Sequence, residues 1–163
     1  MSSLKAAFVV AVVLAAVVSP VVLADPPEQS PLPPISPTVF VGACSFPVLL
    51  EQVAGKEVLR NFSSGNSIVT GKLIVRLTNT TTDRSLVVNV SGPSFFRLNK
   101  DGSASFTLAG RSLLIGNAEM LTPLEGQATL QSGKIVFTFN PSTGEFISAD
   151  FIGNSRDLCA ALA

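Results

Sequence analysis

The chain has 163 residues, of which 47% are hydrophobic and only 13% are charged, with 11 Lys plus Arg balanced by 11 Asp plus Glu and no His. Without an imidazole, the chain cannot form a Ser-His-Asp hydrolase, a Cys-His protease or a His-based zinc site. The balanced charge argues against nucleic-acid binding, which needs a basic surface that releases counterions from phosphates.

Residues 1–24 have the three regions of a secretory signal peptide. Lys5 gives a basic start, residues 6–18 form an apolar run, a Ser-Pro pair breaks it, and the segment ends in a small residue. The alternative, an uncleaved membrane anchor, is disfavoured because the run is shorter than the roughly 20 residues that a spanning helix needs. We therefore expect a mature chain from Asp25 that is secreted, extracellular and without a membrane segment after cleavage.

Residues 25–37 are expected to form a Pro-rich linker, and residues 38–163 a single β domain. Six of the 11 prolines fall in the linker, where their fixed φ and missing N–H favour an extended chain over a folded one. The segment is either a spacer that holds the domain away from a surface or a disordered N-terminus without a role.

Alternation of apolar and polar residues, typical of half-buried strands, predicts an all-β domain. Five segments carry the pattern clearly: residues 72–78, 85–91, 103–108, 134–139 and 147–151. Weaker strand candidates are residues 47–52, 57–62, 67–70, 95–98 and 112–115, and the first two could equally form one short helix.

The connections between these segments contain turn residues, which predict an antiparallel meander of eight to ten strands. The expected reversals lie at residues 64–66, 79–83, 99–102, 109–110 and 140–144. We expect the meander to close into a barrel, because closure removes exposed sheet edges, and the alternative is a β-sandwich. Residues 118–132 lack clean alternation and are expected to be a long loop or an irregular strand.

A short C-terminal helix is predicted over residues 156–162. Asn154 or Ser155 is expected to cap its first turn. The negative charge of Asp157 is expected to interact favourably with the positive N-terminal end of the helix dipole. Leu158 and Leu162 would give it an apolar face that docks on the sheet.

Cys44 and Cys159 are the two cysteines of a chain bound for an oxidising compartment, and we expect them to form a disulfide. A reactive thiol is disfavoured because there is no C-x-x-C motif and no histidine to lower a thiol pKa. If the bridge is present, reduction should raise the intact mass of the mature protein by two hydrogens.

A set of short motifs spread from Cys44 to Leu162 resembles those of small exported β-rich proteins of actinobacterial type, for which no activity is established. The resemblance implies export, a β domain and the disulfide, and it transfers no catalytic or ligand-binding residue. The motifs are Cys44-Ser45-Phe46-Pro47-Val48, a Thr-rich turn into the segment from Arg84 to Pro93, Asp101-Gly102, Gly110-Arg111 and Asp157-Leu158-Cys159.

Few residues are candidates for chemistry, and we predict no catalytic, cofactor-binding or metal-binding residue and no cofactor. Carboxylates that could pair for glycoside hydrolysis show no pairing by spacing and are expected to be solvated. They are Glu51, Glu57, Glu119, Glu125 and Asp150. Asp150 and Arg76 are expected to form a cross-strand ion pair if their strands are neighbours. The sequons at Asn61, Asn79 and Asn89 are interpreted as chance.

Three function classes remain open. The first is a non-enzymatic secreted protein that binds a small apolar ligand, lined by the ten phenylalanines of the mature chain. The second is a structural or surface-interaction protein with a filled interior, in which those phenylalanines are core residues. The third is an enzyme of the barrel-cyclase or isomerase kind, whose mark would be an inward Arg, Asp or Glu with a perturbed pKa. Oligomeric state is not indicated by the sequence.

Overall fold

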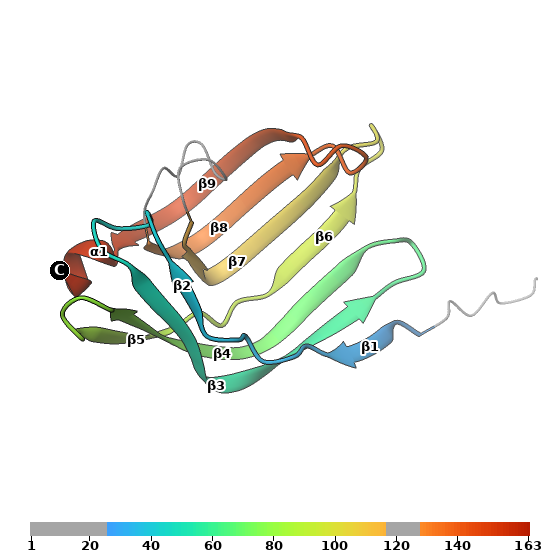
Figure 1. The fold of residues 1–163 in the computed structure, drawn as a ribbon. Coiled ribbons are helices and arrows are strands. Elements are labelled where there is room, and N and C mark those ends of the chain that lie inside the picture. The colour runs from blue at the N-terminus through green and yellow to red at the C-terminus, as the bar shows by residue number, and fades with distance from the viewer. Residues whose placement is uncertain (1–25, 117–127) are drawn as a thin grey trace, which may run out of the picture.

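The computed structural model describes residues 26–116 and 128–163, and it confirms an all-β domain with a short C-terminal helix (Figure 1). The elements are β1 (Glu28–Pro31), β2 (Thr38–Phe40), β3 (Val48–Asn61), β4 (Ser67–Asn79), β5 (Ser85–Asn89), β6 (Ser94–Leu98), β7 (Ala104–Leu114), β8 (Thr129–Phe139), β9 (Phe146–Asp157) and α1 (Cys159–Leu162).

All nine strands belong to one antiparallel sheet with the order β1-β3-β4-β6-β7-β8-β9. β2 pairs with the first residues of β3, and β5 pairs with the last residues of β4. β5 and β6 follow β4 in one common register, from Thr78 opposite Ser85 to Ser67 opposite Phe96. They are therefore one strand interrupted at residues 90–93.

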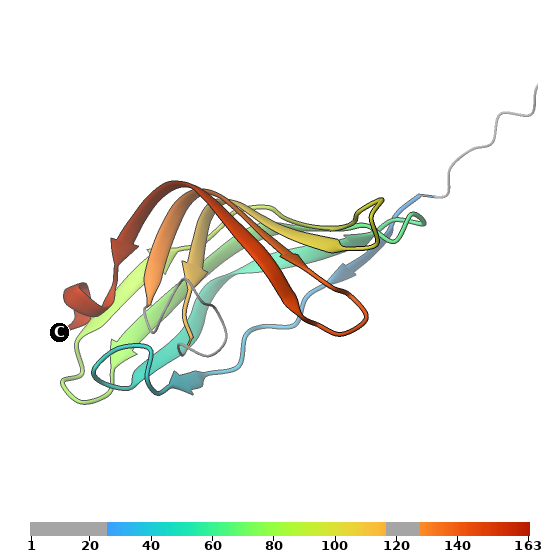
Figure 2. The same cartoon turned by 90° about the horizontal axis from the view of Figure 1, so that it is seen from above.

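The sheet is bent over on itself, so that β7–β9 face β3–β5 across the core (Figures 1 and 2). The predicted barrel is wrong, because the sheet is not closed: within the described residues β9 pairs with β8 alone, and β1 and β2 pair with β3 alone. Prolines between β1 and β2 have no N–H for a ladder, so this edge cannot present one continuous strand to β9. The sandwich alternative also differs, since one continuous sheet supplies both layers.

The predicted Pro-rich linker contributes to the domain. Residues 28–31 form β1 against the end of β3. Further along, the Ile35 backbone N–H donates to Oε1 of Gln52 at 2.8 Å. This part of the N-terminal segment therefore lies along β3.

A cluster of aliphatic side chains, which we call the core cluster, joins the two halves of the sheet. Its members come from β3, β4, β5, β8, α1 and the residues beside them: Val48, Leu50, Val75, Leu77, Val88, Val90, Ala128, Leu130, Leu158 and Leu162. Val48, Leu77, Leu158 and Leu162 are fully excluded from solvent. Burial of each such side chain contributes about 1.5–3 kcal/mol, so this cluster is the main source of stability.

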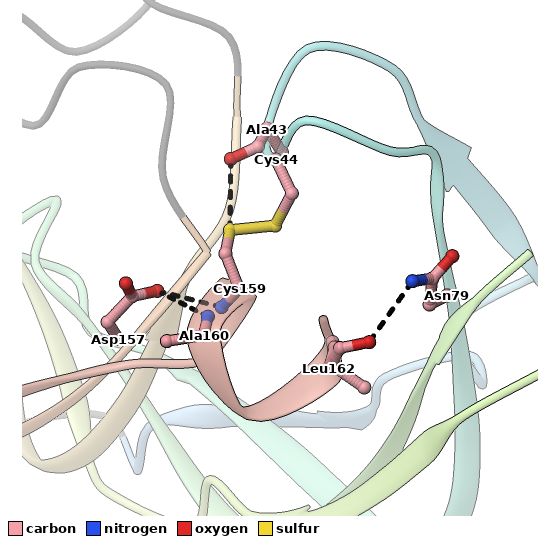
Figure 3. Close-up of a disulfide and its surroundings, with 7 residues drawn as sticks. All are labelled: Ala43, Cys44, Asn79, Asp157, Cys159, Ala160 and Leu162. Carbon is pink, nitrogen blue, oxygen red and sulfur yellow. Dashed lines mark hydrogen bonds between the residues drawn. A yellow bond between two sulfur atoms is a disulfide. The ribbon is translucent and has the colours of Figure 1, made fainter. Parts of the chain in front are cut away.

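The disulfide between Cys44 and Cys159 ties α1 to the segment before β3, as predicted (Figure 3). The two Cα atoms are 5.6 Å apart and 115 positions separate the residues. The carbonyl oxygen of Leu162 accepts a hydrogen bond from Nδ2 of Asn79 at 3.1 Å. Asn79, one of the three sequon asparagines, is only 2% exposed, and its side chain makes a structural hydrogen bond inside the domain.

The C-terminal helix is shorter than predicted. Its expected first residues remain in β9, which stays paired with β8 as far as Asp157 opposite Thr129. The expected caps, Asn154 and Ser155, are strand residues; the N-cap is Leu158, and the side chain of the preceding Asp157 satisfies N–H groups of the first turn. Its Oδ1 accepts from the backbone N–H of Cys159 at 2.7 Å and of Ala160 at 3.3 Å (Figure 3). With only four residues, α1 depends on the disulfide and the core contacts of Leu158 and Leu162.

Four of the five predicted reversals, at residues 64–66, 79–83, 99–102 and 140–144, connect adjacent strands. The fifth, at residues 109–110, is wrong because it lies inside β7. Residues 47–52 and 57–62, for which a short helix was the alternative to strands, fall largely in the single strand β3. Of residues 118–132, the last four belong to β8, and residues 118–127 lie outside the described part.

Gly110 begins a row of glycines across β7, β8 and β9. Gly110 lies opposite Gly133, and Gly133 lies opposite Gly153. Their φ values are +87°, +145° and +144°, a region that side chains with a Cβ rarely adopt. A Cβ on Gly133 would overlap the carbonyl oxygen of Ile152. The row therefore lets three adjacent strands bend together, where the sequence suggested a turn.

Candidate functional site

The sheet carries two apolar hollows, of which the first adjoins the core cluster. The first, which we call the inner cleft, has a volume of about 230 Å³. Its lining residues come from β3, β4, β6 and β7 and from the segments before β2, after β5 and after β7, and they include Ile35, Leu50, Leu73, Val75, Leu108 and Leu113. Leu108 and Leu113 both line it although ideal alternation would place them on opposite faces of β7. Gly110, whose φ is +87°, lies between them.

The second hollow, which we call the phenylalanine groove, has a volume of about 450 Å³. Its lining residues are Phe106, Leu108, Leu114, Phe137, Phe139, Gly144 and Phe146. The strand register gathers the aromatic rings, because it places Phe106 opposite Phe137 and Phe139 opposite Phe146. A further ring, that of Phe96, lies 6.2 Å from that of Phe139 between centroids. Leu108 lines both hollows and therefore lies between the groove and the inner cleft.

None of the ten phenylalanines in the described residues is buried. The fully buried apolar positions are occupied by Ala, Val, Leu and Ile instead. Two phenylalanines, Phe40 and Phe46, pack beside the core cluster, and Phe146 and Phe151 are each 42% exposed. Phenylalanine has the largest apolar surface in this chain, which has no Trp or Tyr. The phenylalanines therefore lie beside the buried core rather than within it.

Glu57 is the one charged side chain among the described residues that line the inner cleft. It lies in β3 opposite Gly71 of β4. A register shift between Gln52 and Ala54 changes which β3 side chains face inward. Glu57 comes after the shift in the strand, and its side chain is one of those that face inward. Burial raises the pKa of the Glu57 carboxyl above its ordinary value of 4.5. The cleft is therefore apolar with one carboxyl at its wall.

The other candidate carboxylates do not join Glu57. Glu51 lies opposite Arg76, and their charged atoms are 4.0 Å apart. The predicted pair of Arg76 with Asp150 is wrong, because β4 and β9 are not neighbours in the sheet. Glu119 and Glu125 lie outside the described residues. The structure therefore brings no two of the described candidates together for glycoside hydrolysis.

Two further findings concern only residues 26–116 and 128–163. No group of three or more His, Cys, Asp or Glu side chains is placed there to hold a metal ion. No helix there combines the length and the hydropathy needed to cross a membrane.

Sequence reasoning missed the inner cleft. Glu57 was considered as a candidate carboxylate, yet alternation could not place it in a cleft, because its orientation depends on the register shift at Gln52. Ile35 was placed in a linker and instead lines the cleft. The available signal was Ile35 itself, an apolar residue within a run of prolines.

Comparisons of the chain with protein-family models, curated proteins and solved structures find no match. The fold and the two hollows are therefore the basis for the functional argument.

Proposed function

We propose that the chain is an exported, non-enzymatic protein that binds a small apolar ligand in the phenylalanine groove and the adjoining inner cleft. The observation that carries this proposal is the set of partly exposed phenylalanines around a groove of about 450 Å³. That volume lies within the range of small-molecule sites, and the lining is apolar, as such sites require. Export is supported by the signal-like N-terminus and by the disulfide, a bond that persists in oxidising compartments.

Partly exposed phenylalanine rings are the reason to prefer binding over a purely structural role. Leaving rings partly exposed forgoes some of the hydrophobic stabilisation that the same side chains would give in the core. A ligand that fills the groove would recover it by covering the rings. Four rings from three strands, Phe106, Phe137, Phe139 and Phe146, can contact one ligand.

The test is binding of a neutral, polarity-sensitive fluorophore such as N-phenyl-1-naphthylamine. Phe137→Ala should weaken binding about tenfold, because one buried aromatic contact contributes about 1.4 kcal/mol. Phe95→Ala is the matched control, since Phe95 precedes Phe96 in β6, points to the opposite face and does not line the groove. Equal affinities for the wild type and both variants, or no binding at all, would refute the groove as the site.

A second candidate function, surface interaction, is favoured by β9. This strand is the last in the sheet order of the described residues, and Ile147 and Ile152 on it are 56% and 71% exposed. An edge strand with exposed apolar side chains can add a strand from another chain. Sedimentation of the purified mature protein tests whether the added strand comes from a second copy of the chain: self-association that Ile152→Lys abolishes would support this candidate, and a monomer at all concentrations would exclude strand addition between copies.

The enzyme alternative has one observation in its favour, the carboxyl of Glu57 with a raised pKa in the inner cleft. Such a group fits a general acid or base. The rest of the described lining has no second titratable side chain, only Ser94 and Ser112 as polar neighbours. A binding role for the same carboxyl needs no second group, and we prefer it.

A further inference from the structure

We propose that the ligand is a cationic amphiphile, with a hydrocarbon body in the apolar inner cleft and an ammonium head held by the carboxylate of Glu57. This inference rests on the proposed binding function and names the ligand class that the site selects. Hydrophobic contact fixes the body but not the head, whereas a single charge at the wall of an apolar cleft discriminates between heads.

Space beside Glu57 is available for such a head. The residue directly opposite it in the sheet is Gly71, which has no side chain to cover the carboxyl. A Cβ on Gly71 would overlap the carbonyl oxygen of Lys56, and its φ of +153° also favours glycine. The close approach of β3 and β4 therefore requires glycine here, so no β4 side chain lies directly opposite the carboxyl of Glu57, which lines the inner cleft.

No partner neutralises Glu57 within the described residues. Its carboxylate takes part in neither the hydrogen bonds nor the ion pair formed there, the latter joining Arg76 to Glu51. Lys56 and Lys72, which lie opposite each other in the sheet, are adjacent to Glu57 and Gly71. They point to the other face of the sheet by alternation, and both are exposed to solvent.

Groups from the other elements around the cleft are uncharged. The segment of residues 32–37 has no ionisable side chain. From β6 and β7, the lining side chains are Ser94, Leu108, Ser112 and Leu113. The two serine hydroxyls can accept a hydrogen bond from an amine or ammonium head, but they supply no charge.

Removal of water from the Glu57 carboxylate favours a ligand with a positively charged head. Burial already raises the pKa of Glu57, which means that the charged form is disfavoured in the empty cleft. A hydrocarbon body would remove further water from the carboxylate, so a neutral ligand increases this cost and an anionic ligand adds repulsion. A cationic head offsets it, because an opposite charge at close range stabilises the carboxylate in surroundings of low dielectric constant.

The test compares three ligands with the same hydrocarbon chain: decyltrimethylammonium, 1-decanol and decane-1-sulfonate, each below its micelle concentration. Each is titrated directly into the mature protein at pH 7 and its binding is measured by calorimetry, so that the readout does not depend on a fluorophore in the phenylalanine groove. Decyltrimethylammonium should bind about tenfold more tightly than 1-decanol. Decane-1-sulfonate should be the weakest. In Glu57→Gln, the cation and the alcohol should become equal, while Glu51→Gln, which removes a carboxylate paired with Arg76, should behave as wild type.

A pH series checks that the preference belongs to Glu57. Both charged probes keep their charge at all pH values used. In the wild type, affinity for decyltrimethylammonium should rise as the pH is raised through the pKa of Glu57, which lies above 4.5. In Glu57→Gln the affinity should not change with pH over that range.

The outcomes separate this inference from the proposed function. If neither the fluorophore nor any decyl ligand binds, the proposed function fails. If all three ligands bind equally, or if the preference persists in Glu57→Gln, the apolar site stands and the cationic class is wrong.

Discussion

In the core cluster, the side chains that meet are Val, Leu and Ala, and most are fully excluded from solvent. In the phenylalanine groove, larger apolar side chains line an open hollow of about 450 Å³. Both regions are built by strands of the same antiparallel sheet. The difference teaches that apolar content alone does not distinguish a core from a binding surface. What distinguishes them is whether opposing elements close over the side chains, as α1 and the disulfide do at the core cluster.

The largest expected effect comes from releasing the bridge at the core cluster. The variant Cys44→Ser with Cys159→Ser should lose up to about 4–5 kcal/mol of unfolding free energy, because the bridge closes a long loop in the unfolded chain. Urea denaturation of the two proteins measures this loss. The wild type with a reducing agent should match the double variant, and an unchanged midpoint would show that the core cluster holds α1 without the bridge.

The second prediction compares one side chain from each region. Leu77→Ala should cost about 2–5 kcal/mol, because Leu77 is fully buried in the core cluster and its truncation leaves a cavity. Phe137→Ala should cost less, although it removes more atoms, because Phe137 is only half-buried. Fluorophore binding should show the reverse order. Equal stability losses would indicate that the phenylalanines of the groove belong to the folding core.

Sequence patterns could predict the parts of this fold that depend on neighbouring residues. Alternation located the main strands, and Gly, Asn and Pro located four of the reversals, because both signals act within a few positions. Gly110 was misinterpreted as a turn because positive φ serves bends and reversals alike. Closure of the sheet and the place of Glu57 depend on register between distant strands, for which a single sequence carries no local signal.

The third prediction concerns the glycine row near the border between the two regions. Gly153→Ala should cost about 3 kcal/mol, because positive φ strains a residue with a Cβ and that atom would overlap the carbonyl oxygen of Ser132. Gly102→Ala is the control for strain alone: its φ is +87°, and a Cβ there meets nothing within 4 Å. It should cost only about 1–2 kcal/mol. Thermal denaturation compares them, and equal losses would exclude the overlap as a cause.

The smallest expected effect links stability to the inner cleft. Because burial raises the pKa of Glu57 in the folded protein above its ordinary value of 4.5, the native state binds a proton more tightly than the unfolded state. The contribution of this carboxyl to stability is therefore greatest below pH 4.5 and declines as the pH rises through the folded-state pKa. Glu57→Gln, which stays uncharged, should unfold at a slightly higher urea concentration than the wild type at pH 7 and at the same concentration at pH 3.

Subtracting the wild-type urea midpoint from that of Glu57→Gln at each pH removes the contributions that both proteins share. If the wild type is the more stable of the two at neutral pH, the Glu57 carboxylate is stabilised in the fold, and a cation is not needed in the cleft. If Glu57→Gln is the more stable at neutral pH, the difference measures the unfavourable burial of a charge. That unfavourable burial is the free energy that a cationic head could recover on binding, whereas covering the uncharged phenylalanines recovers hydrophobic free energy at every pH.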